Sequence, residues 1–472
     1  MNRRTDHRIN GPAPRCTDHR INGPATRRAD RRVNGPATRR ATLALAAAAL
    51  LLAACTGTGG STEGADAKAP DDPSRVSGTI TVLTVRTDLV QDGTMDRYAA
   101  AFNKTHPKVK VEFQALTNYE SEIKIRMNTE NYGDVLLIPA VIEKDDYPKF
   151  FASLGSQEER REKYRFTDFT TVDGKVYGQS PVGVAPGFVY NKRVWKEAGI
   201  TEWPTTPEEF LAALKAVKSR TDAIPYYTNF AAQWPLTSWT YVNGSVSCDT
   251  AATTKLAEGN PWAEGADLRV ADTLLHGIVA QGLAEKDPTT TNWEASKTRL
   301  AKGEIATQWL GTWAVVQFRD AARKAGVNPD DIGFMPFPAQ VDGRFCAVVA
   351  PDYHQAVNIH SDHKEAARAW IDWFTDKSGY VEDNLAISPL QDAPLPEVLK
   401  PYEEQGVELI EVDDARGAEV KRIDNESEVG IYKPDYRQDL VDLARGARDG
   451  DLDGFLDDLG RRWTEARKSL GS

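Results

Sequence analysis

From residue 79 to residue 138, short apolar runs alternate with stretches in which apolar residues recur at helical spacing. The runs are typical of β-strands, and the stretches between them are typical of amphipathic helices. The expected strands are Thr79 to Val85, Lys108 to Phe113 and Asp134 to Ile138, and the expected helices are Asp96 to Asn103 and Glu120 to Asn128. This alternation predicts a parallel sheet with helices on both of its faces.

Polar residues follow the first expected strand directly, as Arg86, Thr87 and Asp88. Ligands of open parallel sheets bind beyond the carboxyl ends of the strands. We therefore expect Arg86 and Asp88 to lie beside a ligand-binding cleft. The competing interpretation is that both are solvated loop residues.

The stretch from Gly174 to Val217 ends one structural unit and begins the next. Val176 to Tyr190 is rich in valine, glycine and aromatic residues and contains two prolines, which indicates extended chain. A short helix is expected from Lys192 to Gly199. The residues Thr206-Pro207-Glu208-Glu209 then combine a cap, a first-turn proline and early acidic residues, which predicts the start of a second helix.

These residues match a family pattern: YG, a glycine-rich extended segment, VYNKRVWKEAGI and WPTTPEEFLAALKAVK, in this order. The pattern resembles the extracellular solute-binding proteins of ABC importers, specifically the maltose-binding-protein-like family 1. The resemblance covers roughly residues 78–463. It implies a two-lobed α/β fold of type II, in which each lobe is a mostly parallel sheet flanked by helices and several strands form the hinge.

The resemblance also implies where the chain crosses between the lobes. Lobe 1 is expected to comprise residues 78–185 and 351–392, and lobe 2 residues 186–350 and 393–472. Phe345 to Val357 is the expected return strand, which recrosses the hinge near Ala350. A third crossing is expected between Ser388 and Pro396.

The segment from Ala223 to Ser247 is unusually aromatic for a stretch interrupted by prolines and glycine. Most of its rings are expected in the core of the second lobe. The family resemblance implies that Gln233 and Trp234 contact a sugar.

A second family signature lies in Glu304 to Val316, which is expected to be a strand that enters a Gly311-Thr312-Trp313 loop. The resemblance implies that Trp313 stacks on a sugar, whereas Trp309 is expected in the core. Near the C-terminus, Tyr432 or Tyr436 is expected to reach the cleft, and Tyr436 is the candidate.

The N-terminal residues predict export. A 12-residue repeat with little apolar content precedes Arg39-Arg40, the apolar run Leu43 to Ala54 and then Cys55, which is the order of a secretory signal. A start at Val33 would give a signal of conventional length. Leu52-Ala53-Ala54-Cys55 resembles the lipobox of bacterial lipoproteins, so residues 1–54 are expected to be a leader and Cys55 a lipidated residue. An ordinary cleaved signal is the alternative.

Residues 55–77 are small, polar and proline-containing, which predicts a flexible tether. Without the 11 arginines and three aspartates of residues 1–54, the chain carries 47 basic and 66 acidic side chains, a formal charge of −19. Such a charge argues against nucleic acid and anionic lipid surfaces as partners. The remaining 418 residues exceed what one core usually supports, so at least two domains are expected.

Cys248 and Cys346 are the two cysteines that follow Cys55. Export favours their oxidation to a disulfide, and two buried thiols are the alternative.

Two motifs suggest metal sites, but neither is complete. Asp449 to Gly454 fits the start of a calcium loop, but position 12 is Gly460 instead of glutamate, and His360 and His363 have no third ligand nearby. We therefore expect no metal and no cofactor.

No G-x-S-x-G, H-E-x-x-H or Walker motif occurs in the sequence. The predicted function is a monomeric, lipid-anchored receptor on the extracytoplasmic face of a bacterial membrane, which binds a sugar or oligosaccharide, passes it to an ABC permease and performs no catalysis. Two alternatives stay open: a sugar-sensing partner of a membrane receptor, and a lipid-anchored glycoside hydrolase.

Overall fold

The computed structural model describes residues 66–116, 119–139 and 142–471. The predicted signal peptide, Cys55 and the first part of the predicted tether lie outside these residues. None of the helices within the described ranges has the length and apolar character needed to cross a membrane.

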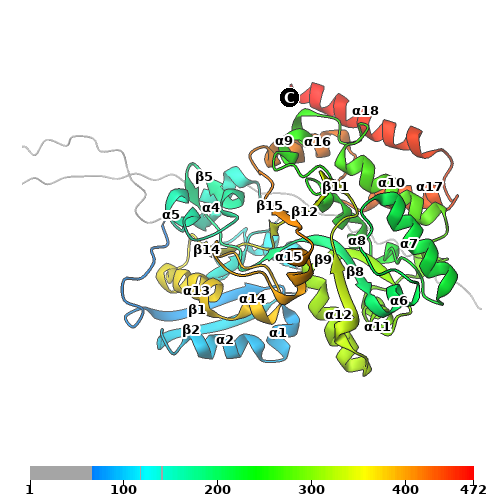
Figure 1. The fold of residues 1–472 in the computed structure, drawn as a ribbon. Helices are drawn as coiled ribbons and strands as arrows, with labels where there is room; N and C mark the ends of the chain where they lie inside the picture. Colours follow the sequence, from blue (N-terminus) through cyan, green and yellow to red (C-terminus); the bar gives the residue numbers. More distant parts are fainter. Residues whose placement is uncertain (1–65, 117–118, 140–141, 472) are drawn as a thin grey trace, which may run out of the picture. The chain divides into compact units, whose positions relative to one another are not determined.

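The first lobe is built on a five-stranded sheet (Figure 1). Its strands, in spatial order, are β2 (Lys108–Ala115), β1 (Ser77–Thr84), β3 (Val135–Leu137), β14 (Gln355–Asn358) and β4 (Phe151–Ala152). β1 pairs in parallel with β2 and β3, as predicted, whereas β14 runs antiparallel to β3 and β4.

Alternation along β1 gives this sheet two buried faces. Ile80 and Val82 pack in one apolar cluster, with α2 (Thr94–Phe102) and α13 (Lys364–Lys377), while Leu83 packs in the cluster on the other face, with α3 (Tyr119–Arg126). A strand that places successive side chains on opposite faces produces this division. The other helices of this lobe are short: α1 (Thr87–Gln91), η1 (Lys144–Asp146), α4 (Tyr147–Phe150), α5 (Gln157–Arg161), η2 (Thr167–Thr170) and α14 (Tyr380–Asp383).

The second lobe corrects one part of the predicted fold class. Its central sheet has the order β10 (Ile332–Met335), β8 (Pro186–Asn191), β9 (Thr307–Gly311), and both pairs are antiparallel rather than parallel. Parallel pairing in this lobe occurs in the isolated bridges Ile224↔Ile305 and Tyr226↔Ala284 and between β12 (Arg344–Val348) and β15 (Glu408–Ile410). A buried apolar run has the same pattern in either direction, so the sequence did not reveal the strand direction.

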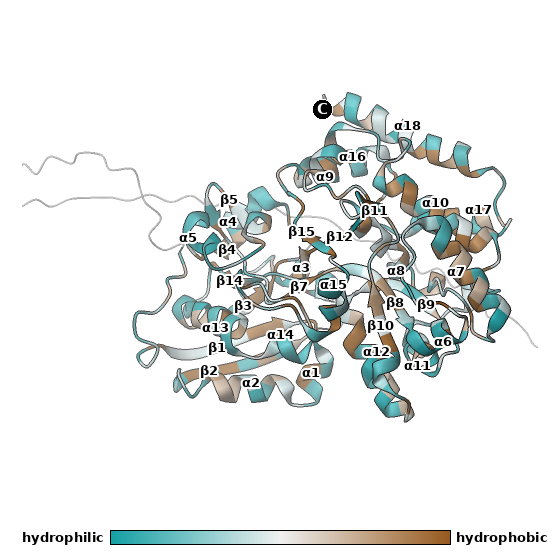
Figure 2. Cartoon of the chain, viewed as in Figure 1, coloured by the Kyte–Doolittle hydropathy of each residue, from teal (hydrophilic) through white to brown (hydrophobic). Residues whose placement is uncertain are grey.

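Helices of the second lobe enclose its main apolar cluster. The predicted cap of α7 (Pro207–Arg220) is present, because the hydroxyl of Thr206 accepts a hydrogen bond from the amide of Glu209. Figure 2 shows hydrophobic and hydrophilic residues alternating around α18, as expected for a helix with one buried face. The helices of this lobe are α6 (Lys192–Glu197), α7, η3 (Phe230–Ala232), α8 (Trp234–Thr237), η4 (Ser238–Val242), α9 (Ala252–Glu258), α10 (Asp267–Ala280), η5 (Pro288–Thr290), α11 (Trp293–Lys302), α12 (Thr312–Ala325), η6 (Pro329–Asp331), η7 (Glu397–Leu399), α15 (Lys400–Glu404), α16 (Gly417–Ser427), α17 (Asp435–Ala444) and α18 (Leu452–Leu470).

Extended segments lie side by side where the chain passes between the lobes. β7 (Gly183–Val184) pairs antiparallel with β13 (Ala350–Pro351), and Gly183 also forms a bridge with Ile387. These pairings fall near the predicted crossings, while the exact lobe boundaries stay a prediction. The remaining strands are two-residue pieces: β5 (Thr171–Val172), β6 (Lys175–Val176) and β11 (Gln340–Val341).

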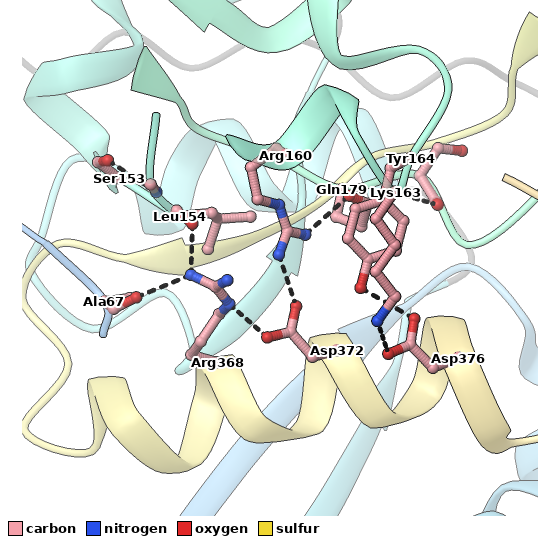
Figure 3. Close-up of polar contacts among 12 residues, drawn as sticks. Ala67, Ser153, Leu154, Arg160, Lys163, Tyr164, Gln179, Arg368, Asp372 and Asp376 are labelled. Carbon is pink, nitrogen blue, oxygen red and sulfur yellow. Dashed lines mark hydrogen bonds and ion pairs between the residues drawn. The ribbon is translucent and has the colours of Figure 1, made fainter. Parts of the chain in front are cut away.

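The described part of the predicted tether is held against the first lobe, which corrects the expectation that it is flexible up to residue 77. Ala67 is 1% exposed, and its amide donates to the carbonyl of Ser153. Its own carbonyl accepts a hydrogen bond from Arg368, which also donates to Leu154 and pairs with Asp372 (Figure 3). This part of the chain therefore belongs to the folded body.

A disulfide joins Cys248 to Cys346, the two residues for which the sequence left a disulfide or free thiols open. Their Cα atoms are 5.4 Å apart, within the range that a disulfide spans. Cys346 lies in β12, which leads into the hinge strand β13, so the bond ties this strand to the loop that follows η4.

Candidate ligand-binding site

A pocket of about 240 Å³ is lined by residues from both lobes. The first lobe contributes Arg86 after β1 and Tyr380 in α14, the second lobe contributes Trp313 and Gln317 from α12, and Asp352 follows the hinge strand β13. The site therefore lies beyond the carboxyl end of β1, at the edge of the sheet where ligands are expected.

Arg86 is held in place by three neighbours. Its guanidinium forms two hydrogen bonds with Asp88, of 2.9 and 2.7 Å, and its remaining terminal nitrogen donates to Asn384 at 2.7 Å and to the hydroxyl of Tyr380 at 3.0 Å. Such a clamp fixes the arginine before any ligand arrives.

Asp88 has a supporting role in this arrangement. Its side chain is 62% exposed and does not line the pocket, in contrast to Arg86. Burial acts to raise the pKa of Asp88, but the hydrogen bond and charge of Arg86 outweigh it and lower the pKa overall. Asp88 therefore remains ionised and orients Arg86.

Trp313 lies in the first turn of α12, which corrects the expectation of a loop at this position. Its half-buried indole folds back over the helix start, where a Cβ atom at residue 311 would come within 2.7 Å of the indole nitrogen. Glycine is therefore required at position 311 for this placement of the ring.

Two further tryptophans pack against Trp313. The ring centroids of Trp234 and Trp293 lie 5.6 and 6.0 Å from that of Trp313, and 5.0 Å from each other. We call these three residues the tryptophan cluster. Trp313 and Trp234 were predicted from the sequence, but Trp293 was not, because nothing in the sequence distinguishes it from an ordinary first residue of a helix.

Gln233 lies next to this cluster but does not line the pocket. It is exposed and has φ +67° and ψ −60°, a conformation that L residues rarely adopt. Its carbonyl accepts a hydrogen bond from Leu236. The structure thus places Gln233 in the tight turn that precedes Trp234.

Tyr436 does not reach the pocket, so its assignment as a cleft residue is wrong. It is 4% exposed, its hydroxyl donates to Asp272 at 3.2 Å, and its ring packs edge-on against Trp262. Burial raises its pKa. Tyr436 lies on the buried face of α17, while Tyr432, the alternative, is 42% exposed.

Asp352 is the acidic residue of the described pocket lining, and it was not predicted from the sequence. Its carboxylate has no side-chain hydrogen bond or ion pair in the described part of the chain. Although Asp352 is exposed, desolvation by the surrounding pocket raises its pKa, and a hydrogen bond from the backbone amide of Tyr353 and the charge of Arg86 partly oppose this. Asp352 and Tyr353 lie inside Phe345 to Val357, which was expected to be one strand, so the rule that selected Arg86 did not select them. In the structure they directly follow the short strand β13.

Residues 87–381, more than half of the chain, match the family described as bacterial extracellular solute-binding proteins. The chain belongs to this family. The resemblance seen in the sequence is thereby confirmed, and members of this family work outside the cytoplasm as solute receptors.

Solved structures agree with this assignment. A manno-oligosaccharide-specific solute-binding protein, BlMnBP2 from Bifidobacterium animalis subsp. lactis, in complex with mannotriose, is 32% identical; the match covers 84% of this chain and 96% of that chain, with a TM-score of 0.77. The ligand-free form of RafE from Streptococcus pneumoniae is 18% identical over 83% of this chain and 98% of that chain, with a TM-score of 0.64. The second likeness shows the two-lobed fold alone.

Among curated proteins, an uncharacterised ABC transporter extracellular-binding protein of Pyrococcus horikoshii is 26% identical over 287 residues, which is 56% of this chain. The match spans 61% of that relative's length.

Proposed function

We propose that this protein is a lipid-anchored extracytoplasmic receptor that binds a sugar or short oligosaccharide between its lobes and delivers it to an ABC importer permease. The observation that carries the proposal is Trp313, which lines a pocket together with the clamped Arg86 and the carboxylate of Asp352, and which packs against the other two tryptophans of the cluster. A pyranose has one face of C–H groups and a rim of hydroxyls. It therefore needs a flat apolar platform with polar groups around the edge.

Binding without hydrolysis fits the acidic residues of the site. A glycosidase needs two carboxyl groups about 5 to 10 Å apart across the scissile bond. Of the described residues that line the pocket, Asp352 alone is acidic. This favours a receptor over the hydrolase alternative.

A thermal-shift screen against mono-, di- and oligosaccharides tests the proposal. Mannobiose and mannotriose come first, because the related BlMnBP proteins were solved with these sugars. A ligand at about 100 times its Kd should stabilise the folded protein by about 2.7 kcal/mol and raise its Tm. If no saccharide raises the Tm, the proposed function is wrong.

Asp352 should make sugar binding depend on pH. Ionised carboxylates accept the stronger hydrogen bonds from hydroxyls. Because desolvation by the surrounding pocket raises the pKa of Asp352 above its ordinary value of 3.8, affinity should begin to fall at a higher pH than that value suggests as the medium is acidified. Asp88, with its lowered pKa, stays charged over this range.

The variant Asp352→Asn should lose this pH dependence and bind the sugar about 5- to 30-fold more weakly at neutral pH, equivalent to about 1 to 2 kcal/mol. Isothermal titration calorimetry of both proteins from neutral pH to about pH 4.5 measures both effects. If the affinity of Asp352→Asn still falls with pH in parallel with the wild-type affinity, a group other than Asp352 causes the pH dependence.

The lipid anchor rests on the sequence Leu52-Ala53-Ala54-Cys55. A diacylated cysteine carries two acyl chains, which suffice for stable membrane attachment. The variant Cys55→Ser should therefore be found in the medium instead of the membrane fraction of the producing cells. Immunoblots of the two fractions measure this, and retention of the variant in the membrane would exclude the anchor.

A further inference from the structure

Exposed aromatic side chains gather beside the pocket. Six large hydrophobic side chains are exposed in the described part of the chain, and four of them are aromatic: Trp234 at 39%, Tyr241 at 54%, Tyr353 at 38% and Tyr432 at 42%. Trp234 belongs to the tryptophan cluster. The three tyrosines belong to neither that cluster nor the polar contacts described above.

Hydrogen bonds connect the segments that carry these three tyrosines, and the amide of Val348, in the strand before Tyr353, donates to Ser245, in the loop after Tyr241. Tyr353 lines the pocket next to Asp352. The hydroxyl of Thr240 donates to the carbonyl of Ile431, which brings the segments of Tyr241 and Tyr432 together. We call Tyr241, Tyr353 and Tyr432 the tyrosine platform.

Tyr241 and Tyr432 are partly desolvated by the surrounding protein, although both are exposed. Burial raises the pKa of Tyr241, with a smaller contribution from the charge of Asp352. Burial also raises the pKa of Tyr432, with a smaller contribution from Tyr241. Tyr353 lines the pocket, so the tyrosine platform adjoins a concavity at this ring, and the electrostatic contributions agree with a position of Tyr241 close to Asp352 and Tyr432.

The backbone and neighbours of each ring are fixed. Tyr353 lies 6.4 Å from the ring of Tyr119, whose hydroxyl exchanges hydrogen bonds with both backbone groups of Leu137. Trp239 and Val242, on either side of Tyr241 along the chain, are fully buried.

Tyr432 is supported in the same way, because the amide of the preceding Ile431 donates to Asp424 at 2.7 Å. Rigid aromatic side chains lose little conformational entropy on binding, so such a surface is organised for a ligand.

The tyrosine hydroxyls are free. Within the described residues, no hydrogen bond engages the hydroxyl of Tyr241, Tyr353 or Tyr432, whereas those of Tyr380 and Tyr436 are bonded to protein groups. Three exposed rings with free hydroxyls offer both apolar faces and polar edges, which is the chemistry that a sugar unit requires.

The pocket itself is small for a long ligand. Its volume of about 240 Å³ is below the roughly 300–1,000 Å³ of pockets that enclose whole drug-sized ligands. Any ligand longer than this pocket must continue onto the surface beside it, and the tyrosine platform adjoins it at Tyr353.

Resting on the proposed function, we infer that the tyrosine platform is a second sugar-binding surface, and that the ligand is an oligosaccharide extending from the tryptophan cluster past Asp352 to these three tyrosines. The tryptophan cluster holds one end of every ligand. The tyrosine platform contacts only units that a longer ligand adds, so it selects for chain length.

The experiment compares Tyr241→Ala with wild-type protein by isothermal titration calorimetry. The probes are mannose, mannobiose, mannotriose and mannotetraose, or the corresponding series of whichever sugar the thermal-shift screen selects. Tyr241→Ala should weaken binding of the longest bound member about tenfold and leave the shortest bound member within about twofold of wild type. Trp313→Ala should weaken all members.

The matched control is Tyr241→Phe, which keeps the ring and should retain most of the affinity for the longest probe. Because Tyr241 is exposed, the Tm of both variants should stay at the wild-type value without ligand. Equal weakening for every length, or no weakening of the longest probe, overturns the inference while the proposed function stands. A wild-type protein that binds no saccharide overturns both.

Discussion

Replacing Asp272 with asparagine should lower the free energy of unfolding by about 3 to 5 kcal/mol, because the change leaves the charge of Arg437 buried without its partner. Both side chains are 0% exposed, and the Arg437 Nε atom donates to Asp272 at 2.9 Å. The other carboxylate oxygen accepts hydrogen bonds from the indole of Trp262 at 2.9 Å and the hydroxyl of Tyr436 at 3.2 Å.

The same network continues towards the tyrosine platform, since Arg437 also donates to Thr240 at 2.6 Å.

Urea unfolding followed by circular dichroism measures the change in stability of Asp272→Asn. The matched control is Asp458→Asn, which removes the charge of a carboxylate that is also on a helix and also paired with an arginine, Arg461. That pair is about half exposed, so the control should change stability by less than about 1 kcal/mol. Similar losses of unfolding free energy in the two variants would show that the buried ion pair stabilises the protein no more than the exposed one.

The elements that were predicted correctly from the sequence are those whose formation depends on neighbouring residues in the chain. β1 and the cap of α7 depend on neighbours within a few residues, such as Thr206 and Glu209, so their patterns are readable without tertiary information. The family resemblance led to the expected hinge crossing near Ala350, whereas the pairing of β7 with β13 was not predicted. The antiparallel direction of β8, β9 and β10 depends on long-range connections, which a buried apolar run does not encode.

In the candidate site too, residues marked by local patterns were predicted and residues placed by long-range packing were not. Arg86 was found because it follows a strand, and Trp313 because a family signature surrounds it. Trp293 reaches Trp313 only because α11 packs beside α12, and Tyr436 points inward because of the rotation of α17. Spacing along one element does not reveal which face of that element meets a cavity, and this is why one residue was missed and another misplaced.

Replacing Trp313 with alanine should weaken sugar binding by about 1.5 to 3 kcal/mol, the scale for losing a buried aromatic contact, or about 10- to 150-fold. The indole lines the pocket and lies at the start of α12, a rigid element, so it is in place before the ligand binds. Trp313→Phe should lose less, because a smaller ring still offers a flat face. Calorimetric titration with the best saccharide from the screen measures both variants.

Trp309 provides the matched control, since it precedes Trp313 by four residues and is 2% exposed in the core of the second lobe. Truncating a core tryptophan costs about 3 to 5 kcal/mol of stability, so Trp309→Ala should melt far earlier than wild type. Trp313→Ala should melt close to the wild-type temperature, because its indole lines a pocket and is only half buried. The two variants thus separate binding from folding at neighbouring positions. If Trp313→Ala binds its sugar normally and melts as early as Trp309→Ala, Trp313 is a core residue and the tryptophan cluster is not the sugar platform.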